Sequence, residues 1–425
     1  MRNNILVLFY ALLFIVSGSI IAKNKQAGID WPRHRGGAEL RGISQAKIGK
    51  TLELDWEFKT GDFLKSSVVV SGNLAFIGAE TGTLFALSLD NGKEVWKYKT
   101  SLGIDAPPLV HEGVVYTGST DGFLYALDAK SGKLIWKYET GGEIMGAANQ
   151  GIRPTTKDSV LVVGSYDNFV HCVNAKTGKV VWTFETQNYV NGVPTISEGK
   201  YVVIGGCDSV LYVIGLEDGK LVRSVEVEAP IAASVSVSDG IGYVGNMDRA
   251  VMAFDLKTGD IVWNYRQKSF PYFSSPAVTK TQVIIGGRDK GLHCINRISG
   301  KQDWRFSARG RIDSSPVASP AVTKTQVIIG GRDKGLHCIN RISGKQDWRF
   351  SARGRIDSSP VVSGDKVVFG SMDGKLYLLS MKDGKEISSY EVGEPISSTP
   401  AVVNERILVS CEDGNVYAFK VKLIK

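Results

Sequence analysis

Histidine and cysteine are scarce in this chain, which has five of each among 425 residues. We can place no Ser-His-Asp arrangement for nucleophilic catalysis. The 48 glycines are spread through turns at a regular spacing, and none marks a phosphate-binding loop. After residue 25 no apolar pattern of useful length has a helical period. These absences argue against a serine hydrolase, a nucleotide-binding loop and a helical domain.

Repetition is what the chain has instead. The phrase Leu127-Asp-Ala-Lys-Ser-Gly-Lys-Leu-Ile-Trp136 returns in variant form along the chain. Successive tryptophans are 40, 40, 46, 81, 41 and 44 residues apart, and the step of 81 covers two units. A period of about 40–50 residues indicates a solenoid, a propeller or an array. The repeated tryptophans are Trp56, Trp96, Trp136, Trp182, Trp263, Trp304 and Trp348.

Each period contains four short stretches of alternating or β-branched residues, separated by turns such as Thr120-Asp-Gly122. Four antiparallel strands repeated radially form a β-propeller, so we predict an all-β fold with one propeller of four-stranded blades. The last unit stops after its third strand, whereas residues 52–59 carry an outer-strand pattern without a preceding unit. We therefore expect the N-terminal strand to close the last blade and to protect its edge. Nine blades are predicted from inner strands near residues 67, 107, 150, 193, 233, 275, 319, 359 and 398.

One of these nine blades is a tandem copy, because residues 275–317 and 319–361 are identical. Copies diverge first at exposed positions, and here even those agree, so the copying was recent, engineered or an error in the gene record. Eight is the upper end of the usual number of blades. A step of 44 residues against 41 for its neighbour places about three extra residues at the inner strand of the copy, where we expect a bulge.

We expect each repeated indole to pack between adjacent blades with its N–H bonded to the backbone, while stacking on a cofactor is the alternative. Two units have Arg223 and Ser388 at the tryptophan position and therefore lack this indole. His171, His293 and His337 each precede a cysteine on a third strand. Alternation along a strand puts the two side chains on opposite faces, so they cannot chelate one metal ion together. We predict solvent-facing or interblade histidines and buried cysteines without disulfides.

The N-terminus predicts export. Residues 5–22 are apolar, follow an arginine and end in small residues, which is typical of a signal peptide within residues 1–25. An uncleaved anchor is the alternative, and this segment would then be the only expected membrane contact. Residues 26–51 are interpreted as a lead-in segment and residues 52–425 as the propeller. We expect a monomer that is secreted or periplasmic in a bacterium.

The charge does not predict nucleic-acid binding, although the chain carries +8. Residues 318–361 alone hold eight Lys or Arg against three Asp and so contribute +5. Seven lysines, one of them within this stretch, each follow a turn glycine, and a lysine at such a position is usually solvated. We therefore predict no nucleic-acid surface.

The phrase at residues 127–136 resembles the repeat of the pyrroloquinoline-quinone-like β-propeller family, and the resemblance covers nearly all of residues 52–425. The segment Asp30-Trp-Pro-Arg-His-Arg-Gly-Gly37 is similar to the opening of secreted bacterial members. The family includes quinone-dependent dehydrogenases, the propeller subunit of the outer-membrane β-barrel assembly machinery, and many secreted members of unknown role. The resemblance implies the fold and leaves the activity open.

The dehydrogenases of that family carry two adjacent cysteines against the quinone, a Ca²⁺ site and a catalytic Asp. In this chain no two cysteines are adjacent, and there is no Cys-x-x-Cys-His sequence for a covalent haem. We therefore predict no catalytic residue, no metal site and no required cofactor, with pyrroloquinoline quinone and Ca²⁺ kept as alternatives.

The mouth of the channel is the expected place for a ligand. Loops leading into the inner strands bring polar or aromatic side chains there, and the longest step predicts an elaborated loop over residues 142–154. Such a ring of side chains could hold a small ligand or a cation, or simply face water. The candidates are Asp105, Asn149, Arg153, Asn191, Phe273, Asp313 and Asp357.

The lack of catalytic groups favours a non-enzymatic, secreted propeller that acts as a protein-interaction scaffold in the bacterial envelope. A rigid disc with variable loops suits recognition of a protein partner. One alternative is a quinone- or cation-binding propeller related to quinoprotein dehydrogenases. Another is a recently amplified or engineered variant whose distinguishing feature is the blade duplication itself.

Overall fold

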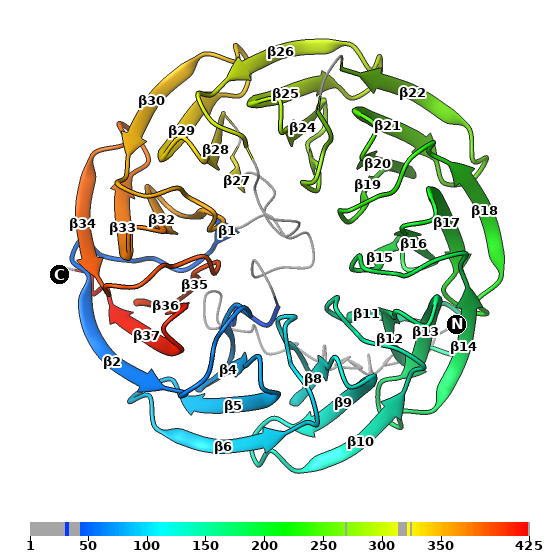
Figure 1. The fold of residues 1–425 in the computed structure, drawn as a ribbon, viewed down its shortest axis with the longest axis horizontal. Helices are drawn as coiled ribbons and strands as arrows, with labels where there is room; N and C mark the ends of the chain where they lie inside the picture. Colours follow the sequence, from blue (N-terminus) through cyan, green and yellow to red (C-terminus); the bar gives the residue numbers. More distant parts are fainter. Residues whose placement is uncertain (1–29, 34–42, 268–269, 313–320, 324, 424–425) are drawn as a thin grey trace, which may run out of the picture.

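Turn residues at the repeat period divide the chain into short strands, and these assemble into nine sheets arranged around a ring (Figure 1). In this computed structural model the described residues are 30–33, 43–267, 270–312, 321–323 and 325–423. Within them there is no helix, and hence none long and apolar enough to cross a membrane. The prediction of an all-β propeller with nine four-stranded blades is confirmed. The predicted signal segment, residues 5–22, lies outside the described part of the chain.

The blades are numbered 1 to 9 along the chain, and in each the four strands of the repeat are antiparallel and run from the channel outward. The inner strands of blades 1 to 9 are β3 (Val69–Ser71), β7 (Leu109–His111), β11 (Asn149–Ile152), β15 (Thr195–Ser197), β19 (Ser236–Ser238), β23 (Ala277–Val278), β27 (Ala321–Val322), β31 (Val361–Ser363) and β35 (Ala401–Val403). The second strands are β4 (Leu74–Gly78), β8 (Val114–Gly118), β12 (Ser159–Gly164), β16 (Tyr201–Gly205), β20 (Ile241–Gly245), β24 (Gln282–Gly286), β28 (Gln326–Gly330), β32 (Lys366–Gly370) and β36 (Arg406–Ser410).

The third strands are β5 (Thr83–Ser88), β9 (Phe123–Asp128), β13 (Phe169–Asn174), β17 (Val210–Gly215), β21 (Ala250–Asp255), β25 (Gly291–Asn296), β29 (Gly335–Asn340), β33 (Lys375–Ser380) and β37 (Asn415–Lys420). The outer strands are β6 (Glu94–Lys99), β10 (Leu134–Glu139), β14 (Val180–Glu185), β18 (Leu221–Glu226), β22 (Ile261–Arg266), β26 (Gln302–Ser307), β30 (Gln346–Ser351), β34 (Glu386–Glu391) and, for blade 9, β2 (Glu53–Lys59).

The two ends of the chain close the ring, as predicted. β2 pairs antiparallel with β37, with Trp56 opposite Ala418, and so supplies the outer strand that blade 9 lacks. Gly49 donates its N–H to the Val421 carbonyl at 2.6 Å, and a Cβ on Gly49 would lie 1.8 Å from the Lys422 carbonyl oxygen. Glycine is therefore required where the two ends of the chain meet.

The lead-in segment adds strand pairing that the repeat pattern did not predict. Trp31 is buried and exchanges two backbone hydrogen bonds, of 2.7 and 2.8 Å, with Val70 of β3. Further along, β1 (Ile43–Ser44) pairs in parallel with β31 and becomes a fifth strand of blade 8. The Ser44 hydroxyl also donates to the Val402 carbonyl of β35 at 2.8 Å. The lead-in thereby covers inner-strand edges of blades 1, 8 and 9.

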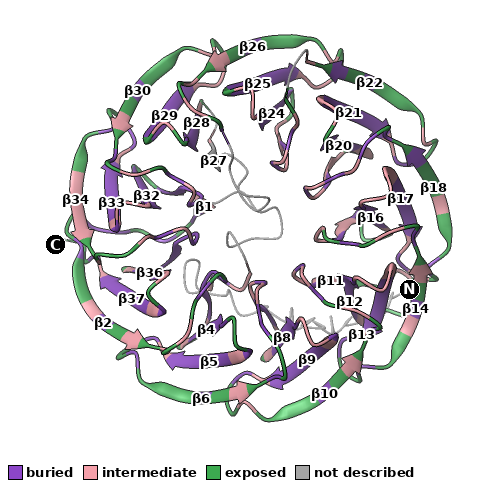
Figure 2. Cartoon of the chain, viewed as in Figure 1, coloured by how far each residue is buried: buried purple, intermediate pink, exposed green. Residues whose placement is uncertain are grey.

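Burial follows the order of the strands in each blade (Figure 2). The second and third strands are almost entirely buried, because both faces of each sheet pack against neighbouring blades. The outer strands form the exposed wall of the ring, and mainly their aromatic position turns inward. The copied unit forms the same strands twice, β23–β26 and β27–β30. The bulge predicted at its inner strand falls on residues 313–320, outside the described residues.

Candidate functional site

The direction of the strands gives the ring two different faces. The loop face carries the loops that lead from an outer strand into the next inner strand, together with the Asp-containing hairpins between second and third strands. The turn face carries the Gly-Lys turns between third and fourth strands. Each face has its own set of contacts between blades.

On the turn face the repeated tryptophan docks one blade on the next. A bulge one residue before the tryptophan shifts the outer strand, as between Leu134 and Trp136, so that the indole turns inward. The indole N–H of Trp136 donates to the Ala175 carbonyl of the next blade at 3.0 Å. The turn Gly178 of that blade lies against the ring, where a Cβ would approach the indole to 2.6 Å. The other indoles that donate in this way are Trp56, Trp96, Trp182, Trp263, Trp304 and Trp348.

The two blades without a tryptophan use other contacts at this position. The Arg223 side chain lies beside Gly259 of blade 5, and its Nε donates to the Thr258 carbonyl at 3.2 Å. Ser388 of blade 8 faces blade 9, which has no Gly-Lys turn because its third and fourth strands come from opposite ends of the chain. Its hydroxyl instead accepts a hydrogen bond from the Leu52 N–H at 3.1 Å.

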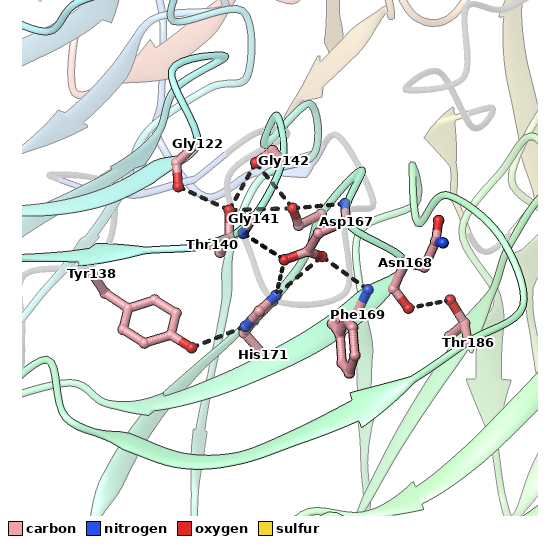
Figure 3. A network of polar contacts seen from close by, with 11 residues as sticks. Gly122, Tyr138, Thr140, Gly141, Gly142, Asp167, Asn168, Phe169, His171 and Thr186 are labelled. Atoms are coloured by element: carbon pink, nitrogen blue, oxygen red, sulfur yellow. Dashed lines mark hydrogen bonds and ion pairs between the residues drawn. The ribbon is translucent and has the colours of Figure 1, made fainter.

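On the loop face a hairpin aspartate and the tyrosine or histidine four residues after it contact the preceding blade. We call such a pair an aspartate latch, and Figure 3 shows the one between blades 2 and 3. The Asp167 carboxylate accepts from the Gly141 N–H, at the end of blade 2, at 2.7 Å and from Nε2 of His171 at 3.0 Å. Because Nε2 donates, Nδ1 of His171 accepts the Tyr138 hydroxyl of blade 2 at 3.0 Å. Burial lowers the pKa of His171, so the imidazole is neutral at pH 7. The histidine serves blade docking.

The same aspartate position recurs around the ring with a tyrosine or a histidine four residues later. Where the residue is tyrosine, its hydroxyl donates to the carboxylate, as from Tyr125 to Asp121 at 2.8 Å. The other tyrosine pairs are Asp208 with Tyr212, Asp373 with Tyr377 and Asp413 with Tyr417. The histidine pairs of the copied unit are Asp289 with His293 and Asp333 with His337.

Identical residues of the copied unit make different contacts. Nδ1 of His293 lies 3.0 Å from the Tyr265 hydroxyl of the preceding blade. In the copy the preceding blade presents Phe306 instead, and Nδ1 of His337 lies 3.0 Å from Oε1 of Gln346 in its own blade. The difference arises because the preceding outer strand is β22 in one case and β26 in the other.

The carboxylates of these two latches are stabilised in their ionised form. Burial of Asp289 opposes ionisation, but hydrogen bonds from His293 and Arg305 outweigh it and lower the pKa to about 2. Burial of Asp333 is likewise outweighed, chiefly by His337, and its pKa is also about 2. Both carboxylates are therefore ionised at any pH above about 4.

The channel mouth is bordered by a rim that all nine blades build in the same way. In each blade the second residue of the hairpin donates its N–H to a carbonyl of the loop entering that blade, at 2.9–3.4 Å. These contacts fasten the described part of each loop to the hairpin of the same blade. The donor and acceptor residues are Glu80 and Phe63, Thr120 and Gly103, Tyr166 and Glu143, Cys207 and Tyr189, Met247 and Pro230, Arg288 and Pro271, Arg332 and Arg311, Met372 and Arg355, and Glu412 and Pro395.

Four of the predicted channel residues lie on this rim, each beside a side chain of opposite or complementary character. Asp105 lies 3.8 Å from the Lys65 ammonium group, and Asp357 accepts from Nε of Arg355 at 2.6 Å. The Asn191 amide donates to the Cys207 sulfur at 3.4 Å. The Phe273 ring lies 3.9 Å from the guanidinium carbon of Arg288. Asp313 lies outside the described residues.

The other two candidates are held by contacts away from the rim. Oδ1 of Asn149 accepts from the Arg33 guanidinium of the lead-in segment at 3.0 Å. Arg153 follows β11 and therefore lies on the turn face, where it pairs with the Glu217 carboxylate at 3.0 Å. The extra residues of this unit form the turn 153–158 between β11 and β12 and do not enlarge the loop that leads into the blade. The structure thus does not bring these two residues together with the rim candidates.

Exposed apolar residues on the loop face were not singled out from the sequence. The Tyr166 and Tyr189 rings stack with centroids 4.9 Å apart, and the Tyr189 side chain is 49% exposed. Met247 and Phe270 follow on the next two blades, with 43% and 52% exposure. We call Tyr166, Tyr189, Met247 and Phe270 the aromatic arc. In the sequence each of these residues is only an apolar residue beside a turn. The equivalent positions of the other repeat units carry different residue types, so the repeat pattern does not point to them.

In the described part of the chain, the rim does not offer the oxygen cage that Ca²⁺ requires. Calcium takes six to eight oxygen ligands, several of them carboxylates. The rim carboxylates of Asp105 and Asp357 are already paired with Lys65 and Arg355. Among the described residues no three His, Cys, Asp or Glu side chains are grouped so as to hold a metal ion. The described side chains of the rim therefore do not form a Ca²⁺ site of this kind.

The cysteines do not supply a reactive thiol beside this rim either. All five are free, and Cys207 is the only one that is not fully buried. Burial raises the pKa of Cys172 and Cys411 to about 12. Burial also raises the pKa of Cys207, so its thiol stays protonated at neutral pH.

Comparison with known proteins agrees with this architecture. The family described as the β-propeller of the β-alanine-activating enzyme matches residues 147–421, and the family described as outer membrane protein assembly factor BamB matches residues 43–165. Outer membrane protein assembly factor BamB of Pseudomonas aeruginosa is 29% identical over 85 residues, which span 20% of this chain and 21% of that protein. The matched stretch is thus about a fifth of the length of this relative.

Two solved structures share the fold at low sequence identity. BamB from Moraxella catarrhalis aligns with a TM-score of 0.58 and 16% identity over 87% of this chain and 99% of that chain. The quinohemoprotein alcohol dehydrogenase ADHIIG from Pseudomonas putida HK5 aligns with a TM-score of 0.64 and 14% identity over 94% of this chain and 82% of that chain. Because the first family match extends over more than half of the chain, this protein belongs to the β-propeller family named after the β-alanine-activating enzyme, among the pyrroloquinoline-quinone-like repeat propellers.

Proposed function

We propose that this protein is a non-enzymatic interaction scaffold of the bacterial envelope and that it binds a protein partner through its loop face. The observation that carries the proposal is the rim: nine equivalent backbone hydrogen bonds fasten the described parts of the loops to the hairpins around the channel mouth. Loops fastened in this way lose less conformational freedom on binding, which favours recognition. The envelope location is supported by the similarity to an assembly factor of the outer membrane.

The aromatic arc is the proposed centre of the interface. Tyrosine, phenylalanine and methionine are enriched at protein interfaces and dominate their binding energy. Tyr189, Met247 and Phe270 are large, exposed and carried by neighbouring blades, so one partner surface could contact all three. The stacked Tyr166 supports Tyr189 and keeps it in one orientation. Exposed apolar side chains that are fixed in place are better suited to binding than to solvation.

The experiment is capture from a bacterial envelope extract by the purified protein, followed by identification of the retained proteins. The test variant is Tyr189→Ser with Met247→Ser. The control is Val95→Ser with Ile135→Ser, since these two residues are equally exposed, at 47% each, but lie at bulges of the outer wall. We expect one outer-membrane assembly component to be retained by the unchanged protein and the control and lost by the test variant. Equal retention by both variants would refute the proposed face.

The absence of enzymatic activity is part of the same proposal, and it is supported by the pairing of Asp105 and Asp357 on the rim with Lys65 and Arg355. We expect titration with pyrroloquinoline quinone, with and without Ca²⁺, to leave the tryptophan fluorescence without a saturable change. Saturable quenching that requires Ca²⁺ would instead support a cofactor-binding propeller and would call for dehydrogenase assays.

A further inference from the structure

A stacked pair of tyrosines stands on the rim where blades 3 and 4 meet. Tyr166 belongs to the hairpin of blade 3 and Tyr189 to the loop that enters blade 4, and their ring planes are 15° apart. The Tyr166 N–H donates to the Glu143 carbonyl at 3.0 Å, so the rim hydrogen bond fixes the backbone of Glu143 beside the pair. We call Tyr166, Tyr189 and Glu143 the tyrosine site.

The carboxylate of the tyrosine site is available to a ligand. Glu143 is exposed, and within the described residues no cation and no hydrogen-bond donor engages its side chain. Burial raises the pKa of the Tyr166 phenol, and the neighbouring Cys207 thiol and Glu143 carboxylate raise it further. The charge of Glu143 therefore acts on Tyr166, and the phenol is neutral at pH 7. A neutral phenol ring has electron-rich faces that attract a cation.

The loop face of blades 2 to 4 has five carboxylates in its loops and hairpins and no Lys, Arg or His. Asp105 is paired with Lys65 of blade 1 at 3.8 Å. The three latch aspartates accept hydrogen bonds from tyrosine or from neutral histidine and keep their charge in place. Glu143 is the fifth carboxylate. This part of the rim therefore attracts a cationic partner. The segments counted are residues 100–108, 119–122, 140–148, 165–168, 186–194 and 206–209.

The far side of the ring carries charge of the other sign. The loop that enters blade 8, residues 352–360, contains Arg353 and Arg355 against Asp357, and Figure 1 shows blade 8 across the ring from blades 3 and 4. A basic segment is repelled there and directed to the tyrosine site. A nucleic-acid backbone is repelled by the carboxylates of blades 2 to 4. Because no three carboxylate, His or Cys side chains of the described residues are grouped for a metal ion, the charge suits a basic polypeptide better.

We propose that the tyrosine site binds an arginine side chain in a basic segment of a partner protein, with the guanidinium against the tyrosine rings and hydrogen-bonded to the Glu143 carboxylate. Arginine suits both contacts, because its planar group stacks on aromatic rings and matches a carboxylate in two-point hydrogen bonds. Lysine is a strongly hydrated point charge and lacks this plane. The inference rests on the proposed function and names the chemistry of the partner.

The test measures binding of a fluorescein-labelled peptide of about ten residues, alternating Arg and Ser, by anisotropy in about 50 mM NaCl, where screening is weak. The test variants are Glu143→Gln and Tyr166→Leu. The control for charge is Glu198→Gln, which removes the same charge from an exposed position on the turn face of blade 4. The control for the ring is Tyr166→Phe, and a peptide with Lys in place of Arg tests the need for a planar cation.

The two contacts should contribute modestly and separately. We expect saturable binding that Glu143→Gln weakens about threefold or more and Tyr166→Leu about twofold or more, as for an exposed ion pair and an exposed cation–ring contact. Glu198→Gln and Tyr166→Phe should change the affinity by less than about 1.5-fold, and the Lys peptide should bind about twofold or more weakly. Circular dichroism checks that each variant is folded. If Tyr166→Leu does not fold, Tyr189→Leu replaces it, because the Tyr189 side chain is 49% exposed.

Three results would overturn the inference. Equal weakening by Glu143→Gln and Glu198→Gln would show that net charge alone attracts the peptide. Equal affinity for the Arg and Lys peptides, with Tyr166→Leu unchanged, would show that the rings take no part. No saturable binding of the Arg peptide would remove the site.

The capture experiment separates this inference from the proposed function. Retention of the same envelope protein by Glu143→Gln, with loss by the variant Tyr189→Ser with Met247→Ser, would leave the interaction scaffold in place and refute the basic segment. Loss by Glu143→Gln and retention by Glu198→Gln would support both. If the unchanged protein captures no partner, the proposed function fails, and the peptide titration alone decides whether the tyrosine site binds arginine.

Discussion

The docking of the tryptophan on a turn glycine can be tested with one methyl group. Gly132 has a φ of +69°, and a Cβ added to it would lie 2.5 Å from Cδ2 of Trp96 on the preceding blade. Gly259 occupies the same turn in blade 5 with a φ of +81°, but its neighbour is the Arg223 side chain, at 3.4 Å from the added Cβ. We therefore compare Gly132→Ala with Gly259→Ala.

The two substitutions share one cost and differ in another. Both place an L-residue in the left-handed region, which costs about 1–2 kcal/mol. Only Gly132→Ala also forces a methyl group into a packed indole, and overpacking typically costs a further ~1–3 kcal/mol. The Arg223 side chain is flexible and can move away from a Cβ at 3.4 Å. We expect Gly132→Ala to lower the free energy of unfolding by about 2–5 kcal/mol and Gly259→Ala by about 1–2 kcal/mol.

The measurement is urea unfolding followed by circular dichroism, which avoids a direct effect of the substitution on indole fluorescence. A third variant, Gly113→Ala, serves as a control for backbone strain alone, since its φ is +78° and a Cβ would meet nothing within 4 Å. Equal unfolding midpoints for Gly132→Ala and Gly113→Ala, at unchanged m-values, would show that the indole does not confine the glycine. The docking argument would then be wrong.

Other predictions follow from the two sets of interblade contacts. Asp289 and Asp333 have folded-state pKa values of about 2, below the ~3.9 of an unfolded Asp, so their stabilisation is complete above about pH 4 and is lost as the pH falls from 4 to 2. The free energy of unfolding, measured with urea between pH 4 and pH 2, should therefore change less in the variant Asp289→Asn with Asp333→Asn than in the unchanged protein. An equal change in both proteins would show that the two carboxylates do not stabilise the fold. Trp136→Phe removes the hydrogen bond to the Ala175 carbonyl, and we expect the free energy of unfolding in the same assay to fall by roughly 1–3 kcal/mol. An unchanged free energy of unfolding would show that this hydrogen bond does not stabilise the ring. Deletion of residues 318–361 should leave one cooperative thermal transition, because the remaining copy presents the same third and outer strands to blade 8; two separate transitions would refute this.

The architecture could be predicted from the sequence because its determinants are local and repeated. The turn glycine, the hairpin aspartate and the outer tryptophan recur at fixed spacing, so blade number and closure by residues 53–59 follow from counting. The pairing of Trp31 with Val70 and of β1 with β31 could not be predicted in this way. These contacts join short segments without a strand pattern to the free edges of inner strands, and that pairing depends on the closed ring.

The candidate site was harder to predict for a physical reason. The length of a repeat step shows that residues were added but not where they lie, and the additions near Arg153 form a turn on the face opposite the rim. A polar residue before an inner strand was a useful indicator for Asp105 and Asp357, which do lie on the rim. Whether such a carboxylate is available to a cation depends on its neighbours. Arg355 stands two residues before Asp357 in the same loop, whereas Lys65, the neighbour of Asp105, comes from the preceding blade, and no spacing within one unit reveals it.

The duplication shows why fold and binding surface vary independently in this ring. A complete period contains both halves of each docking contact, the outer tryptophan and the turn glycine that receives the preceding one, so a copied period can be inserted without leaving a contact unmade. The rim hydrogen bonds join only backbone atoms, so they too form whatever side chains the copied unit carries. The side chains on the rim are under no such constraint. Copying a blade therefore preserves the ring while multiplying whatever that blade exposes at the channel mouth, which in this protein is arginine.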